Sequence, residues 1–218
     1  MLIKDIVDLT AHPIAHPAYG AKCRETLDHE GVLVLSDFIR PAALTALRDE
    51  SIAEKDKAYF CAQNHSVYLT PPNSAFPDDH PANLQVVSSK GCICDDDVGA
   101  QSPLRVLYDA LDFRNFVATV TGQTALHPYE DPLSSINIHY ANRGQELGWH
   151  FDNSSFAITL LIQKPDAGSQ FEFIKDLRDA DAKEMNFEGV RALLTGEVQP
   201  QVLAMEPGAL VLFRGRNS

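Results

Sequence analysis

The feature that most constrains the fold of this chain is a change in its hydrophobic period near residue 135. Upstream, the segment 104–111 carries leucines at three- and four-residue spacing, which is typical of one face of a helix. Downstream, the apolar residues of 136–140 alternate with Asn137 and His139, which is typical of a half-buried strand. Helices first and short strands afterwards indicate an α+β fold whose β part is a barrel or jelly roll.

The same patterns predict further elements along the chain. We expect helices at 21–28, from Pro41 into the charged stretch ending at Lys57, from Pro103, and at 114–120. We expect strands at 32–35, 136–140, 156–162, 171–174, 202–205 and 209–213, with the last two joined by a turn at 206–208. Residues 64–81, rich in Pro, Asn, Ser and Asp, predict a long loop over a site, and 179–194 predicts a polar helical insertion.

Length and composition bound the class of protein. With 218 residues and 44% hydrophobic content, we expect one domain over 1–218, mainly helical over 1–125 and with a β core over 126–218. A net charge of -12 disfavours nucleic acid and membrane partners. The start of the chain lacks the pattern of a signal peptide, and we expect its four cysteines to be reduced in the cytoplasm. Nothing in the sequence indicates the oligomeric state.

The candidate site is the pair His150 and Asp152. On an extended backbone, residues two apart point the same way, so both side chains can bind one ion. An imidazole and a carboxylate are two of the three ligands in the facial triad that holds Fe(II). The triplet alone is weak evidence, because His-x-Asp arises readily by chance, and the alternative is a surface histidine beside an acidic strand end.

Three segments resemble, in order and spacing, the prolyl-hydroxylase-like Fe(II)/2-oxoglutarate oxygenases. Residues 140–144 followed by His150-Phe151-Asp152 are similar to that family's tyrosine strand, glycine turn and iron strand. Residues 168–173 are similar to its next, glycine-led strand, and 207–213 to the strand before its last metal ligand. The segment 31–38 is similar to the strand that opens these proteins. The resemblance implies a double-stranded β-helix (a jelly roll, cupin-like) with N-terminal helices packed on it.

The same resemblance implies cofactors and site residues. Fe(II) would be held by His150 and Asp152, and 2-oxoglutarate would receive a hydrogen bond from Tyr140. Trp149, Asn153 and Glu130 are candidates for substrate contacts. The alternatives are core packing for the two aromatic residues and solvated polar side chains for the other two.

A finer resemblance concerns the reaction. Segments 129–133 and 148–153 look most like those of free-standing amino-acid hydroxylases and radical halogenases. Radical halogenases of this type have a small residue where hydroxylases have the carboxylate ligand, and here that residue is Asp152. The resemblance therefore implies hydroxylation of an unactivated C–H in a small molecule, an amino acid or derivative, with release of succinate and CO2.

The chain departs from the family at its end. The family has a distal iron-binding histidine shortly after the strand that ends here at Phe213, and a basic 2-oxoglutarate anchor about ten residues later; no histidine follows His150. We expect that the natural chain continues beyond Ser218. The alternatives are a truncated or degenerate β-helix protein that binds a small ligand or partner without catalysis, and a cupin-like enzyme that uses a divalent ion as a Lewis acid.

Overall fold

The computed structural model describes residues 1–131, 133–168 and 170–218, so Pro132 and Ser169, which belong to segments quoted above, lie outside the described residues. The elements are α1 (Ile3–Ile6), α2 (Pro17–Glu30), β1 (Val32–Leu35), α3 (Pro41–Glu54), β2 (Tyr59–Ser66), β3 (Gln85–Ile93), α4 (Pro103–Asp109), α5 (Leu111–Thr121), β4 (Ile138–Tyr140), β5 (Ala157–Leu160), β6 (Phe171–Phe173), α6 (Phe187–Leu194), β7 (Gln201–Leu203) and β8 (Leu210–Phe213), with short 3-10 turns at Lys55–Lys57 and Asp95–Asp97. The fold is mixed α/β with antiparallel sheets, and the described strands form no closed barrel.

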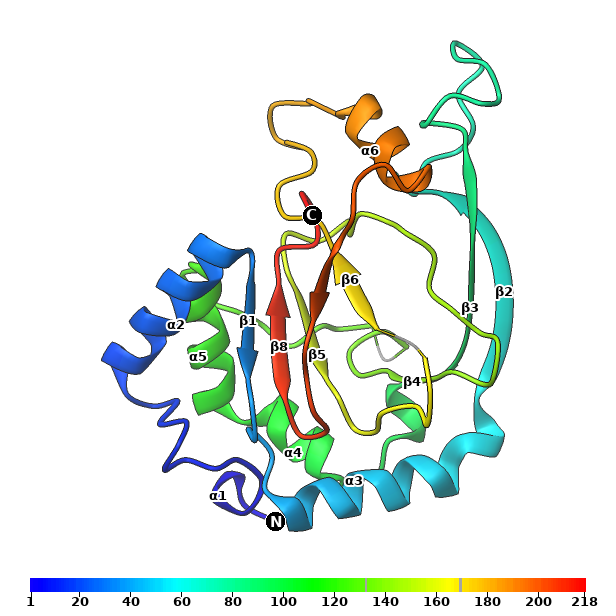
Figure 1. Cartoon of the computed structure of the whole chain (residues 1–218). Coiled ribbons are helices and arrows are strands. Elements are labelled where there is room, and N and C mark those ends of the chain that lie inside the picture. The colour runs from blue at the N-terminus through cyan, green and yellow to red at the C-terminus, as the bar shows by residue number, and fades with distance from the viewer. Residues whose placement is uncertain (132, 169) are drawn as a thin grey trace.

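The central sheet has the order β1-β8-β5 and is covered on one face by helices (Figure 1). Leu33 and Leu212 point into the main core, where they pack against Leu27 of α2 and Phe116 of α5. A β-strand with one buried face shows alternation, but β1 and β8 are apolar at every position because both of their faces are buried.

The second face of the central sheet packs on the two-stranded sheet β6-β7. Val32 and Val211 lie against Phe173, and the ring of Phe213 contacts those of Phe171 and Phe173 edge-on at 5.4 and 5.6 Å. Strand β7 pairs with β6 and does not pair with β8. The turn expected at 206–208 is present, with the N–H of Ala209 donating to the carbonyl of Glu206. It joins strands of two different sheets, since β8 pairs with β1 and β5.

A third sheet, β2-β3-β4, contains the longest strands, which lie at the far side of the molecule from α2 (Figure 1). Strand β2 was not expected from the sequence, because it is exposed along most of its length and shows no apolar alternation. The loop expected at 64–81 starts later than predicted, since β2 continues to Ser66 and β3 begins at Gln85.

The boundaries of α2, α3 and α5 differ from expectation by up to four residues, and two further differences change the interpretation of the chain. The helix that starts at Pro103 ends at Asp109, so Leu111 opens a new helix and is 63% exposed instead of sharing a buried face with Leu107. In the segment 179–194, only α6 is helical; it begins at Asn186, whose side chain accepts a hydrogen bond from the N–H of Gly189.

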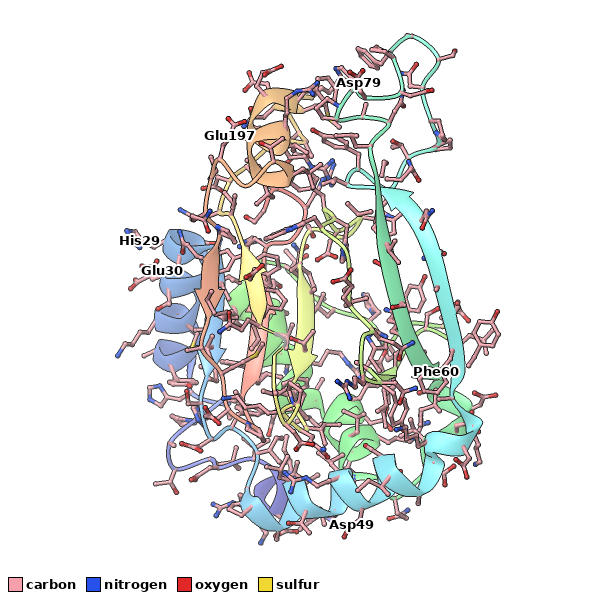
Figure 2. The ribbon with its side chains drawn as sticks, turned by 45° about the vertical axis from the view of Figure 1, so that its right-hand side comes forward. His29, Glu30, Asp49, Phe60, Asp79 and Glu197 are labelled. Carbon is pink, nitrogen blue, oxygen red and sulfur yellow. The ribbon has the colours of Figure 1, made fainter. Side chains whose placement is uncertain are left out.

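The loop between β2 and β3 lies against α6. Figure 2 shows Asp79 of this loop beside the helix, and Arg191 of α6 donates a hydrogen bond to the carbonyl of Asp79. The ring of Phe187 contacts His80 edge-on at 4.6 Å, and the hydroxyl of Tyr68 donates to the carbonyl of Met185. The loop is therefore packed on the segment that precedes and forms α6.

Candidate functional site

The segment that carries the candidate ligands is held between two distant parts of the chain. The N–H of Phe151 donates to the carbonyl of Val67, 2.9 Å away, and the N–H of Asp152 donates to the carbonyl of Gly215, 2.8 Å away. Neighbouring N–H groups that bind on opposite sides are typical of extended backbone, although no regular strand forms here. The segment thus joins the end of β2 to the residues that follow β8.

The close approach of this segment to β3 requires glycine at 148. The N–H of Gly148 donates to the hydroxyl of Ser88 at 2.9 Å. A Cβ atom at residue 148 would lie 2.6 Å from the carbonyl oxygen of Val87, which is closer than any stable contact. The glycine before the iron motif is therefore explained by packing against β3.

His150 is oriented by its own backbone. Its Nδ1 lies 2.7 Å from the carbonyl oxygen of Gly148. Since a carbonyl only accepts, Nδ1 carries the proton of the neutral ring and Nε2 keeps a free lone pair. A metal-binding histidine has this arrangement, in which one nitrogen is anchored and the other binds the ion.

Asp152 faces the same space as the free nitrogen of His150. Its Oδ1 lies 3.7 Å from His150 Nε2, and the two side chains are 28% and 32% exposed. Burial raises the pKa of the Asp152 carboxyl, and the nearby His150 partly offsets this shift. Metal binding would favour the ionised carboxylate that burial disfavours.

The donor set fits part of a metal site. A neutral imidazole and a carboxylate are suited to Fe(II), and here both approach one space from the same segment. In residues 1–131, 133–168 and 170–218, no group of three His, Cys, Asp or Glu side chains is placed to hold an ion. The described residues therefore bring together two of the three side chains that a facial triad requires.

His65 was not predicted from the sequence, yet its ring lies beside that of His150. The ring centroids are 6.0 Å apart and the planes are nearly perpendicular, at 89°. Its Nδ1 donates to the carbonyl of Ser66, so its Nε2 accepts the hydroxyl proton of Ser88 at 2.6 Å. Ser88 in turn accepts from Gly148, so His65 supports the position of the His150 segment.

The other predicted residues lie in different environments. The hydroxyl of Tyr140 donates to the carbonyl of Ser51 in α3, 2.8 Å away, so the predicted contact with 2-oxoglutarate stays a prediction. Trp149 packs on a small buried cluster that includes Phe151. Asn153 lines a pocket next to Asp152, whereas Glu130 is exposed in the loop before β4. Their predicted substrate contacts also stay predictions.

The imidazole of His139 has a strongly shifted pKa. It lies on β4 with Nε2 3.4 Å from the ammonium of Lys90 on β3. The residue is exposed on its strand, although the protein atoms around the ring partly desolvate it. Burial, and secondly Lys90, lower the pKa of His139 to about 4, so the ring is neutral at pH 7.

This shift predicts a pH dependence of stability. The unfolded chain protonates His139 near pH 6.5, whereas the folded protein resists until about pH 4. Between these values the unfolded state binds more protons, so the free energy of unfolding falls as the pH drops through this window. Urea midpoints measured at pH 7 and pH 4.5 should show a smaller loss in His139→Asn than in the wild type. An equal loss in both proteins would contradict the assignment.

Comparison with known proteins identifies a family. The model of the family described as halogenase D matches residues 16–217, which is nearly the whole chain. No curated protein matches the chain. The match indicates a halogenase-related enzyme.

In the part of the chain that the structure describes, no helix is both long and apolar enough to span a membrane.

Proposed function

Because this chain belongs to the halogenase D family, we propose that it is a non-haem Fe(II)/2-oxoglutarate oxygenase that hydroxylates an unactivated C–H of an amino acid or derivative. The reaction releases succinate and CO2. We further propose that the fold is a double-stranded β-helix. Its support is the antiparallel sheet β1-β8-β5, which carries helices on one face and the smaller sheet β6-β7 on the other.

The observation that carries the proposal is the geometry of His150 and Asp152. Their donor atoms are 3.7 Å apart and face one space, and the free nitrogen of His150 is defined by the bond from Nδ1 to Gly148. Bound iron, together with 2-oxoglutarate and O2, supplies the oxidising power that no protein side chain has. The chain itself orients the two ligands through backbone bonds to Val67 and Gly215.

Hydroxylation is favoured over halogenation by the residue at position 152. The radical halogenases that this chain resembles have a small residue at the corresponding position, which leaves room for a halide. Asp152 instead directs a carboxylate oxygen toward the space that Nε2 of His150 faces. We therefore propose that this member of the family is a hydroxylase, and that the small-molecule substrate is amino-acid-like.

The test is turnover by the purified protein. Succinate formation is measured with Fe(II), 2-oxoglutarate and a panel of free amino acids, and the organic product is analysed by mass spectrometry. We expect a hydroxylated product and a rate on the order of 1 s⁻¹ with the preferred substrate. Turnover should disappear with a chelator and return with Fe(II). If no amino acid raises succinate formation above the chelated control, the protein is better described as a non-catalytic ligand-binding relative.

A further inference from the structure

A basic pocket lies directly beside the candidate iron ligands of this acidic protein. The chain has a net charge of -12, yet Arg178, Lys183 and Arg216 all line one pocket of about 310 Å³. Asp152 and Asn153 line the same pocket. Its volume is at the lower end of the range for small-molecule sites, so it suits a ligand of amino-acid size. Three cations on one small concave surface create a local field opposite to that of the whole chain.

Arg178 is held in a fixed orientation in this pocket. Its Nε donates to the carbonyl of Arg216 at 2.7 Å. The guanidinium carbon lies 4.1 Å from the centre of the Phe151 ring and 5.9 Å from that of Tyr68. Stacking and one hydrogen bond leave the outer edge of the guanidinium available as a pair of parallel donors.

Neither Arg178 nor Lys183 is neutralised by the protein. Among the described residues, no carboxylate lies within ion-pair distance of either side chain. Arg216 alone has such a partner, since its Nη2 lies 3.1 Å from Oδ1 of Asp181. The protein thus places two cations without acidic partners at a small pocket. Lys183 is exposed to solvent, but Arg178 is half-buried, and leaving its charge unpaired costs free energy unless an anion binds there.

Hydrogen bonds within the loop that carries Lys183 fix its conformation. Asp179 and Glu184 exchange two backbone hydrogen bonds of 3.0 and 2.8 Å, and Oδ1 of Asp179 accepts from two further N–H groups of the loop. Lys183 has φ of 61°, a left-handed conformation that is unfavourable for a lysine. The bonds across this turn hold the strained residue beside the pocket.

The same loop is tied to the end of the chain. The N–H of Ala180 donates to the side chain of Asn217, and the N–H of Arg178 donates to the carbonyl of Asn217. Figure 1 shows the C-terminus beside the segment that leads into α6. The three cations therefore come from two segments that are bonded to each other, and one of these segments also contacts Asp152 through Gly215.

We propose that this pocket binds the carboxylate of the amino-acid-like substrate, with the guanidinium of Arg178 as the principal ligand. The inference rests on the proposed function for the substrate class, but not for the binding itself. A carboxylate matches the paired donors of a guanidinium, and Lys183 and Arg216 add charge without defined geometry. The co-substrate 2-oxoglutarate carries the same chemical group, so the experiment separates these two sources.

The experiment measures binding without turnover. Calorimetric titration of the metal-free protein, in the presence of a chelator, uses 2-oxoglutarate, free amino acids and the matching amino-acid amides, which lack the carboxylate. We expect an amino acid to bind and its amide to bind at least about tenfold more weakly, as expected for loss of a charge-assisted hydrogen bond. Affinity for the acid should fall as salt is raised.

Variants then assign the binding to the pocket. Arg178→Gln should weaken amino-acid binding about tenfold or more, and Lys183→Gln less, because Lys183 is exposed. The matched control is Arg24→Gln, which changes a surface arginine paired with Asp28 and should leave affinity unchanged. Thermal melting confirms that each variant is folded. In the active enzyme, Arg178→Gln should raise KM for the amino acid with little change in kcat.

Each outcome decides a different statement. If Arg178→Gln weakens only 2-oxoglutarate, the pocket binds the co-substrate and the substrate assignment is wrong. If Arg178→Gln binds every acid with the same affinity as the Arg24→Gln control, the pocket is not a carboxylate site. These titrations need neither iron nor O2. Carboxylate binding can therefore be observed when turnover is absent, and turnover can be observed when the pocket binds no carboxylate.

Discussion

Replacement of Asp152 by glycine is expected to lower hydroxylation by on the order of 10²-fold or more, since even the residues that support metal ligands typically contribute 10- to 100-fold. The carboxylate oxygen 3.7 Å from His150 Nε2 would be lost, and with it one of the two proposed iron ligands. In the presence of chloride, the vacated position should also allow a chlorinated product. Product masses from reactions with and without chloride measure both effects.

The matched control for this experiment is Asp152→Glu. It keeps the carboxylate, so it should give no chlorinated product even if the longer side chain lowers the rate. Iron affinity, measured separately by equilibrium dialysis, should be lower in Asp152→Gly than in the wild type. If Asp152→Gly hydroxylates as fast as the wild type, the carboxylate is not a metal ligand and the proposed site is wrong.

The sequence predicted the local geometry of the site but not its surroundings. His150 and Asp152 are two residues apart, so an extended backbone is sufficient to bring their side chains together. His65 is 85 residues upstream of His150 and lies on β2, which is exposed along most of its length. An exposed strand lacks apolar alternation, so nothing local revealed that His65 would lie beside the site.

Tyr140 shows how the partner strand decides what a side chain contacts. Alternation indicated a strand at 136–140, of which 138–140 form β4, and His139 and Tyr140 point to opposite faces. Which face meets the helices depends on the pairing of β4 with β3, and this long-range pairing places the Tyr140 hydroxyl against Ser51 of α3. The resemblance had assigned that hydroxyl to 2-oxoglutarate.

The order of strands in the central sheet also could not be predicted from local sequence patterns. The apolar runs at β1 and β8 were both predicted, and their apolar composition fits strands buried on two faces. That β8 lies between β1 and β5, and does not form a hairpin with β7, is set by contacts between residues far apart in the sequence. Burial of Val211 against Phe173 and of Leu212 in the main core requires β8 at this position.

Gly215→Ala is expected to disable the site without unfolding the protein. A Cβ atom at residue 215 would lie 2.6 Å from Cγ of Asp152 and closer still to its Oδ2. Gly215 is not among the residues with positive φ, so the backbone itself accepts an alanine. The added methyl group must displace the Asp152 carboxylate, and we expect Fe(II) affinity and turnover to fall about 10- to 100-fold.

The matched control is Gly99→Ala, whose Cβ would meet only the end of the Glu50 side chain at 3.3 Å. It should leave Fe(II) affinity and turnover unchanged. A double-mutant cycle then identifies the cause, because alanine at 215 has no carboxylate to displace when residue 152 is glycine. The loss of Fe(II) affinity and any loss of thermal stability in Gly215→Ala should therefore not add to those of Asp152→Gly. Additive losses would mean that Gly215 acts through the backbone and not through the position of the Asp152 carboxylate.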